Sequence, residues 1–360
     1  MVETSPCTVP TAMEGHGAYN RNSRVQAATV SPALSTLEQA ARMCTLPPES
    51  QPIVIADYGC SQGQNSLIPV LAAINVLRER TGSHRQISVA HSDLPENDFT
   101  SLFQILLTNP ESYLRKHSAA FASAIGRSFY EQILPAGSVT LGWSSWAVQW
   151  LSRTPLPIRD QVQVALSKDA PTRAAFARQA AEDWEQFLIL RERELSPGGK
   201  LVVLTLAFDD NGDFGYRPLL NAMYSALQEM VDSGFLLRGE LQRMAIPTVA
   251  RSRADFLAPF GANHRVNGLY VEEIEIFFGV DHIWLDFEQY RDARRFAAEW
   301  TAFSRASVFP TLASGLDGGR TSPRTADFMN RLEAGVVTRL AAKPEPMLIP
   351  LGRLLIAKKT

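Results

Sequence analysis

Two carboxylates and two glycines in the first hundred residues could together seat a nucleoside-like ligand. Asp57, Gly59 and Gly63 follow one apolar run, and Asp93 follows the next. Glycine lets a backbone approach a ligand closely, while a carboxylate can accept hydrogen bonds from an ammonium group or a ribose diol. Because the spacing is D-x-G-x-x-x-G rather than G-x-G-x-x-G, the pyrophosphate-binding pattern of dinucleotide folds is not indicated.

Alternating strands and helices are predicted to position these residues. Short β-branched or apolar runs alternate with amphipathic segments, as expected for a doubly wound α/β sheet covered on both faces. Ligands of such sheets bind at the carboxyl ends of the strands, where we also expect the turn Pro197-Gly198-Gly199 to lie. The predicted strands are 52–57, 86–90, 138–141 and 200–205, and the predicted helices begin near 67 and cover 101–107, 117–133 and 171–194.

The second half of the chain is predicted to form a mostly helical cap and to complete the sheet. We expect cap helices at 218–232, 287–303 and 324–342, strands at 269–278 and 353–359, an irregular segment at 240–260 and a mobile loop at 314–324. The resulting domain prediction has three parts. They are a disordered N-terminus (1–12), an α/β domain (13–210, 265–285 and 345–360) and a cap that forms the substrate pocket (211–264 and 286–344).

Composition narrows the class of protein. The 360 residues are 45 % hydrophobic, which permits a sizeable core, and the net charge of −2 gives no basic excess for binding nucleic acid. Three cysteines without metal-ligand spacing predict reduced thiols and a cytoplasmic protein. We expect no signal peptide and no membrane span, because no apolar stretch is long enough.

Five motifs, in order along the chain, point to one family. They are Tyr19-Asn-Arg-Asn-Ser23-Arg-Val-Gln26, Ile55-Ala-Asp57-Tyr-Gly59-Cys-Ser-Gln-Gly63-Gln-Asn65-Ser, Asp93-Leu94-Pro-Glu-Asn-Asp-Phe, Ser128-Phe129-Tyr130 and Ser144-Ser-Trp146-Ala-Val-Gln149-Trp150-Leu-Ser. This series resembles the SABATH carboxyl methyltransferases, the salicylic acid, benzoic acid and theobromine type. The resemblance implies a class I methyltransferase fold, S-adenosylmethionine as cofactor, and a homodimer.

Site residues follow from the same resemblance. Gln26 and Trp150 would hold the substrate carboxylate, and Trp146 and Gln149 would line the acceptor pocket. Plant members commonly have Tyr in place of Trp146, and salicylate-type members have Met in place of Gln149, so a plant-type substrate is not implied. Outside Ile246-Pro247 the segment 240–260 diverges, which leaves the cation site of some members unsupported. The residues that would contact the cofactor are Tyr19, Ser23, Asp57, Gly59, Asn65, Asp93, Leu94, Ser128 and Phe129.

The proposed acceptor simplifies the chemistry. A carboxylic acid has a pKa near ~4 and is an anion at neutral pH, so its methylation needs no general base. Trp150 and Gln26 offer neutral N–H donors, which orient an oxygen without the charge of an arginine. The predicted reaction is therefore methyl ester formation on a small aromatic or fatty acid.

Two other functions stay open at this point. One is methylation of a nitrogen or hydroxyl on a small molecule, where a phenol with a pKa near ~10 would need a base. His91 is the one histidine near the motifs, and we interpret it as a polar residue at a strand end. The other is a non-catalytic cofactor-binding protein. The six scattered histidines indicate no metal site.

Several further side chains are expected to be structural. Trp143 is predicted to lie in the core, and Met223, Met230 and Phe235 to pack the cap, where some could line the pocket. The charged run 191–194 (Arg-Glu-Arg-Glu) is predicted to form a solvated helix face.

Overall fold

The computed structural model describes residues 12–15, 17, 20, 24–260 and 266–360, without the side chains of 24–31. Tyr19, Ser23 and the predicted disordered N-terminus up to residue 11 lie outside this description. Gln26 is placed only by its backbone. No helix in the described ranges is long and apolar enough to cross a membrane.

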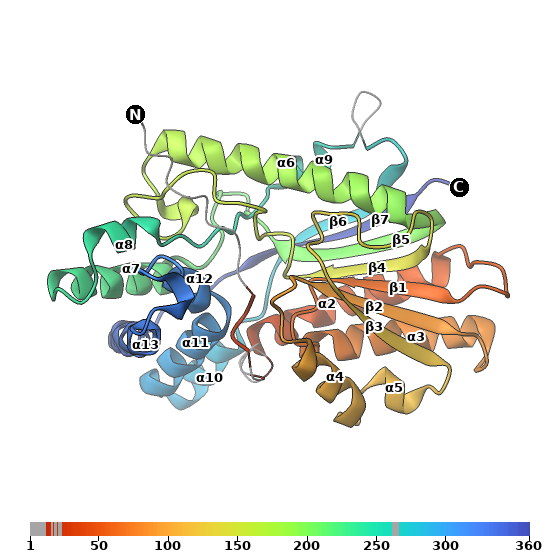
Figure 1. Cartoon of the computed structure of the whole chain (residues 1–360), viewed down its shortest axis with the longest axis horizontal. Coiled ribbons are helices and arrows are strands. Elements are labelled where there is room, and N and C mark those ends of the chain that lie inside the picture. Colours follow the sequence, from red (N-terminus) through yellow and green to blue (C-terminus); the bar gives the residue numbers. More distant parts are fainter. Residues whose placement is uncertain (1–11, 16, 18–19, 21–23, 261–265) are drawn as a thin grey trace.

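A seven-stranded sheet with the order β3-β2-β1-β4-β5-β7-β6 forms the centre of the molecule (Figure 1). The strands β1 to β5 are parallel, and β7 is antiparallel to both of its neighbours. The two late strands therefore complete the sheet, as predicted. The bounds are β1 Ile53–Tyr58, β2 Ile87–Asp93, β3 Ala120–Gly126, β4 Val139–Ser145, β5 Leu195–Leu206, β6 Leu269–Phe278 and β7 Pro350–Lys358.

Helices cover both faces of the sheet, which confirms the doubly wound arrangement (Figure 1). On one face lie α2 (Arg24–Met43), α3 (Leu67–Thr81), α4 (Phe99–Thr108) and α5 (Tyr113–Lys116), and on the other lie α6 (Ala170–Glu194) and α9 (Arg253–Leu257). Short 3-10 turns connect these elements at η1 (Gln64–Ser66) and η2 (Val164–Leu166). Trp143 is buried in the core, as expected.

The predicted helix at 117–133 is wrong, because this segment contains the edge strand β3. Its alanines favour a helix by intrinsic propensity. Seven residues of β3 nevertheless pair with β2 in parallel register, from Ala120 beside Ile87 to Gly126 beside Asp93. Pairing with an existing strand thus overrides local preference at the sheet edge.

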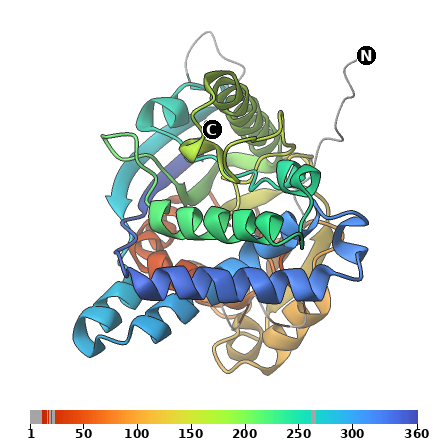
Figure 2. The same cartoon turned by 90° about the vertical axis from the view of Figure 1, so that its left-hand side faces the viewer.

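Helices of the cap gather beyond the carboxyl ends of the parallel strands (Figure 2). They are α7 (Arg217–Asp232), α8 (Arg238–Arg243), α10 (His282–Tyr290), α11 (Ala293–Ser307), α12 (Phe309–Ala313) and α13 (Thr325–Ala342). The single helix predicted at 287–303 is interrupted at Arg291, whose φ is 56°, and Asp292 then caps α11. The segment predicted as irregular contains α8 and α9, while the predicted loop 314–324 contains the turn η3 (Gly319–Thr321).

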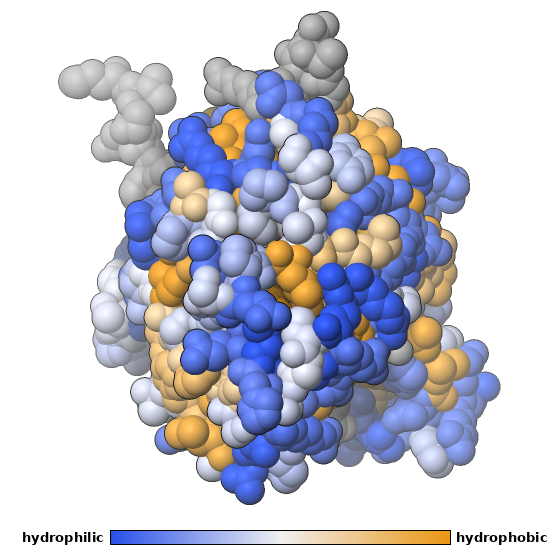
Figure 3. Space-filling view, turned by 90° about the vertical axis from the view of Figure 1, so that its right-hand side faces the viewer, coloured by the Kyte–Doolittle hydropathy of each residue, from blue (hydrophilic) through white to orange (hydrophobic). Residues whose placement is uncertain are grey.

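The Pro197-Gly198-Gly199 turn lies at the amino ends of the strands, whereas the ligand site is predicted at their carboxyl ends. It falls near the amino end of β5, where Lys200 already pairs with Leu141. Gly198 has a φ of 72°, and a Cβ there would come within 2.1 Å of the Thr45 hydroxyl. This turn therefore packs the sheet against the segment after α2, and its predicted convergence with Asp57 is wrong. The face of the molecule at the amino ends of the strands carries many hydrophilic residues with hydrophobic groups scattered among them (Figure 3).

The predicted solvated face at 191–194 is wrong for two of its four residues, since Arg193 is exposed and Glu192 half-buried. Arg191 and Glu194 are fully buried and paired at 3.0 Å, and the Arg191 guanidinium lies 4.3 Å above the Tyr58 ring. Tyr58 also donates to Glu194 over 2.8 Å. The pair binds the backbone of the loop after β3 at Phe129, Glu131, Ile133 and Leu134. Two buried charges are thereby satisfied by each other and by the loop.

Candidate active site

A cavity of about 340 Å³ opens at the carboxyl ends of β1, β2 and β4. Five residues predicted to contact the cofactor line it: Gly59, Asp93, Leu94, Ser128 and Phe129. They come from separate loops, which the parallel strands bring to one edge. Ala12, Met13, Ser61, Tyr130, Glu131, Ser145, Trp146, Ala147, Trp150, Leu151 and Ser152 complete the lining.

Asp93 is held rigidly at the wall of this first cavity. One carboxylate oxygen accepts from the Ser61 N–H and the other from the Leu94 N–H, each over 2.8 Å. Burial raises the pKa of Asp93 to about 6, against the lowering effect of these two backbone bonds. Each oxygen keeps a further lone pair, so the group can accept from a ribose diol.

The loop after β1 is shaped by its glycines. Gly59 has a φ of 87°, and a Cβ there would lie 2.4 Å from the Ala147 Cβ at the cavity wall. Gly63 has a φ of 85° and a corresponding clash at 2.3 Å with Leu102 of α4. Gly63 thus serves helix packing, whereas Gly59 allows the close approach at the site. Ser61 also has a positive φ, 47°, and its buried hydroxyl has no hydrogen-bond partner among the described residues.

Phe129 supplies a flat apolar wall to the first cavity. Its ring centroid lies 4.8 Å from that of Tyr130 and 6.1 Å from that of Phe187. The carbonyl of Phe129 accepts from the buried Arg191 over 2.8 Å, which fixes the loop. A rigid aromatic face of this kind suits a purine ring.

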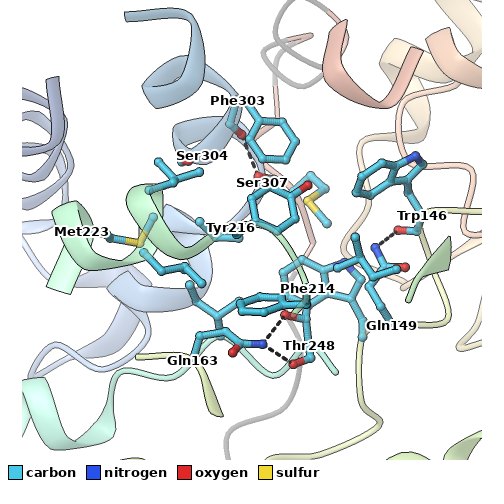
Figure 4. Close-up of a pocket in the computed structure, with 17 residues that line it drawn as sticks. Trp146, Gln149, Gln163, Phe214, Tyr216, Met223, Thr248, Phe303, Ser304 and Ser307 are labelled. Carbon is cyan, nitrogen blue, oxygen red and sulfur yellow. Dashed lines mark hydrogen bonds between the residues drawn. The ribbon is translucent and has the colours of Figure 1, made fainter. Parts of the chain in front are cut away.

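A second, smaller cavity of about 70 Å³ lies between the sheet and the cap (Figure 4). None of the described residues that line it carries a formal charge. An occupant would therefore have an apolar, uncharged body. The lining consists of Met13, Trp146, Gln149, Trp150, Gln163, Leu206, Phe214, Tyr216, Leu219, Leu220, Met223, Ile246, Thr248, Phe303, Ser304, Ser307 and Val308.

Trp146 and Trp150 border both cavities, together with Met13. Trp146 has a left-handed backbone, with a φ of 55°, and its carbonyl accepts from the Gln149 amide over 2.7 Å. The Trp150 carbonyl accepts from the Tyr130 hydroxyl over 2.6 Å. The two predicted substrate-side tryptophans thus lie at the junction where a donor and an acceptor could meet.

Gln149 lines the second cavity, but its amide has structural partners. Its Nε2 donates to Trp146, and its Oε1 accepts from the Thr205 hydroxyl over 2.9 Å. Gln163, on the opposite wall, donates to the Thr248 carbonyl over 2.8 Å (Figure 4). These bonded amides hold the walls of the cavity in place.

Two predicted cofactor residues line neither cavity. Asp57 is almost fully buried, and its Oδ2 lies 2.7 Å from His91 Nδ1. Asn65 lies in η1, at the start of α3. Their cofactor contacts remain predictions, as do those of Tyr19 and Ser23 outside the described residues and of the Gln26 side chain.

One group of potential metal ligands occurs among the described residues. Ligand atoms of Asp57, Cys60 and His91 lie within 4.8 Å of one another. Both ring nitrogens of His91 are hydrogen bonded, one to Asp57 and the other to Tyr113 over 2.9 Å. Burial raises the pKa of the Cys60 thiol well above its usual value, with the nearby carboxylates contributing. A protonated thiol and an engaged imidazole are poor ligands, so the donor set does not fit a metal.

Sequence reasoning missed most of the acceptor wall. Gln163, Phe214 and Thr248 lie outside the main helices and strands, and no periodic pattern marks them. Ser304 and Ser307 lie on α11, where they resemble ordinary helix residues. Met223 and Ile246, singled out in the sequence, do line the cavity.

The strand order is that of the class I methyltransferase fold, and the first cavity lies at its strand ends. A family model described as SAM dependent carboxyl methyltransferase matches residues 9–319. The chain therefore belongs to the SAM-dependent carboxyl methyltransferases, which confirms the resemblance to the SABATH group and S-adenosylmethionine as the cofactor.

Individual relatives agree with this membership. Anthranilate O-methyltransferase 2 of Zea mays is 27 % identical, over 66 % of this chain and 69 % of its own length. Methyltransferase LUC1 of a Fusarium species is 31 % identical, over 68 % of this chain and 64 % of its own length. The benzoic acid/salicylic acid carboxyl methyltransferase 3 of Petunia hybrida is 30 % identical, over 67 % and 71 %.

A solved structure supports the fold. Loganic acid methyltransferase with SAH superposes with a TM-score of 0.75 at 19 % identity, covering 98 % of this chain and 99 % of that chain. The fold is thus shared over nearly the whole length of both chains.

Proposed function

We propose that the protein converts a small, largely apolar carboxylic acid into its methyl ester. The observation that carries this proposal is the junction at Trp146 and Trp150 between a nucleoside-sized cavity and an uncharged second cavity. Benzoate-like aromatic acids and fatty acids are the substrate classes that fit such a lining. Relatives named for anthranilate and for benzoic or salicylic acid support this choice.

Residues at the first cavity and beside it suit the chemistry of the cofactor. Asp93 would hold the ribose, Phe129 would border the adenine, and Asp57 would accept from the ammonium group. S-adenosylmethionine supplies an activated methyl group on sulfur. The chain then has to seat the acceptor oxygen in line with that group and exclude water, and positioning supplies most of the rate.

On the acceptor side, we assign the carboxylate to the indole N–H of Trp150 and the amide of Gln26. The place of Trp150 at the junction supports this clamp. One carboxylate oxygen forms the new bond to the methyl carbon as the carbon–sulfur bond breaks, so no proton has to move. Neutral donors orient that oxygen and leave its charge available.

A hydroxyl acceptor fits less well. A phenol would need a base to remove its proton. No His, Asp or Glu is found among the described residues that line the second cavity, and His91 lines neither cavity. Methylation of a nitrogen, and retention of the fold without catalysis, are alternatives that the experiment below would reveal.

We also propose that the enzyme acts as a homodimer in the cytoplasm. The dimer rests on the family resemblance. Cys44 and Cys60, both free and buried, are compatible with a reducing compartment. Light scattering of the purified chain would measure the oligomeric state.

A screen of acids with methyl-labelled S-adenosylmethionine tests the proposed function. Aromatic, aliphatic and isoprenoid acids would be compared with their primary amides, which keep the shape and lose the carboxylate. We expect label in a product that releases methanol in base, from acids only. Base-stable label, or equal labelling of the amides, would overturn the carboxyl assignment.

A further inference from the structure

We propose that His91 and Tyr113 form a buried hydrogen-bonded chain that positions Asp57 to bind the cofactor ammonium group. The two are positioning residues, because they act through Asp57 and contact neither cavity. The proposal rests on the proposed cofactor role of Asp57. It assigns a function to two residues that family membership alone does not explain.

The geometry of the chain is set by the sheet. Asp57 in β1 and His91 in β2 are direct partners in the parallel register, so their side chains share one face of the sheet. Tyr113 begins α5, which covers that face (Figure 1). Asp57 Oδ2 lies 2.7 Å from His91 Nδ1, and His91 Nε2 lies 2.9 Å from the Tyr113 hydroxyl.

The direction of each hydrogen bond can be assigned. A carboxylate oxygen only accepts, so His91 carries its proton on Nδ1 and donates to Asp57. With a single ring proton, on Nδ1, Nε2 accepts from the Tyr113 hydroxyl. Burial raises the pKa of Tyr113 well above its usual value, with Asp57 and Cys60 adding to the shift, so the hydroxyl keeps its proton.

This arrangement leaves little freedom to Asp57. The side chains of His91 and Asp57 are 0 % and 3 % exposed, so water cannot replace the bond between them. The bond fixes Oδ2. Oδ1 takes no part in the bonds to His91 and Tyr113, and we assign it to the ammonium group. Buried partners behind a binding group fix its orientation in this way in other proteins.

Two substitutions of His91 separate this role from simple packing. In Asn the side-chain nitrogen occupies about the place of Nδ1, so His91→Asn can still donate to Asp57. In Gln it occupies about the place of Nε2, so His91→Gln loses that bond. Tyr113→Phe keeps the ring and removes only the proton that holds the histidine tautomer.

The measurement compares two ligands in each variant by calorimetry. S-adenosylhomocysteine carries the ammonium and carboxylate, whereas 5′-methylthioadenosine has the same nucleoside and thioether without them. The ratio of their dissociation constants reports on the amino acid end alone. It also does not depend on how much of a variant is folded.

We expect His91→Gln to lower the affinity for S-adenosylhomocysteine by about tenfold and Tyr113→Phe to lower it by about threefold. In both variants the affinity for 5′-methylthioadenosine should stay within about twofold of the wild-type value. His91→Asn should retain the wild-type ratio. As a matched control, Tyr58→Phe removes another buried tyrosine hydroxyl, which belongs to the last residue of β1 and donates to Glu194. It should change both affinities by one factor.

Other outcomes would overturn the proposal. If His91→Gln weakens both ligands equally, His91 is a packing residue. An unchanged ratio in Asp57→Asn would show that Asp57 does not bind the ammonium group. The positioning role of His91 and Tyr113 would then be wrong, while the proposed methyl transfer would be unaffected. If the wild-type protein contains a stoichiometric metal ion that His91→Gln lacks, His91 is a metal ligand and not a positioning residue for Asp57. If wild type binds neither ligand, the proposed function itself fails.

Discussion

Gln149 holds Trp146 in place, since its amide donates to the Trp146 carbonyl over 2.7 Å while accepting from Thr205. Trp146 has a left-handed backbone and separates the two cavities. A residue predicted to touch substrate thus also fixes the wall against which the substrate lies.

Replacing Gln149 should therefore affect the acceptor more than the cofactor. Gln149→Met leaves the buried Trp146 carbonyl without its donor, at a cost of about 1–3 kcal/mol in unfolding free energy. We expect KM for the best acid to rise about tenfold and cofactor affinity to change less than about threefold. Steady-state kinetics would measure both. Thr205→Val is the matched control, because it removes only the second bond of the amide, and an equal effect of both variants would contradict the account.

The carboxylate clamp predicts a graded loss at Trp150. Trp150→Phe keeps an aromatic ring and removes the N–H donor, so kcat/KM should fall about 10- to 100-fold, the value of a hydrogen bond to a charged group. Trp150→Ala should cost more, because ring packing is lost too. Gln26→Ala should resemble Trp150→Phe. Cofactor affinity, measured separately, should barely change, and full activity in both Trp150→Phe and Gln26→Ala would refute the clamp.

Asp93 should make cofactor binding dependent on pH. Its pKa is raised to about 6 by burial, and the protonated group accepts fewer hydrogen bonds from a ribose diol. Affinity for S-adenosylhomocysteine should therefore fall as the pH drops through 6, approaching about tenfold per pH unit below the pKa. Calorimetry from pH 5 to 8 would show this. Asp93→Asn should bind with a flat profile, and an unchanged slope in that variant would assign the titration to another group.

The same raised pKa has the opposite sign for stability. Between about pH 4 and 6 the folded chain retains a proton on Asp93 that the unfolded chain has released. The contribution of Asp93 thus favours folding at low pH and is lost as the pH rises through this window.

The buried Arg191–Glu194 pair predicts a large single-site effect. Arg191→Met would leave Glu194 buried and unpaired, at a cost of about 3–5 kcal/mol in unfolding free energy. Glu194→Leu should cost a similar amount, because it leaves Arg191 buried without its charged partner. The double variant should cost less than the sum of the two, because neither charge is then left alone. Denaturant unfolding would measure all three, and strict additivity would mean that the two charges act independently.

Sequence patterns predicted the parts of the site that lie next to strands. Asp57, Gly59 and Asp93 follow apolar runs, and parallel strands bring their ends to one edge. The edge strand β3 was missed because its alanines favour a helix when considered alone. Charged residues such as Arg191 give no sign of burial in the sequence, since the backbone carbonyls that complete its hydrogen bonds, those of Phe129 and Glu131, lie on a distant loop.

Residues of the acceptor cavity were harder to predict. Gln163 and Thr248 are 85 positions apart in the sequence, and their hydrogen bond forms only in the folded chain, where the two segments pack together. The position of Pro197-Gly198-Gly199 shows the converse error. The sequence predicts this recognisable turn at the carboxyl ends of the strands, beside the ligand site, although it lies near the amino end of β5.

A crystal structure with S-adenosylhomocysteine and the best acid from the screen would test the carboxylate clamp most directly. We expect the carboxylate at the junction of the two cavities, within hydrogen-bond distance of the Trp150 indole nitrogen and the Gln26 amide, with the body of the acid in the uncharged cavity. A carboxylate bound away from Trp150, with another group of the acid facing the sulfur, would contradict it.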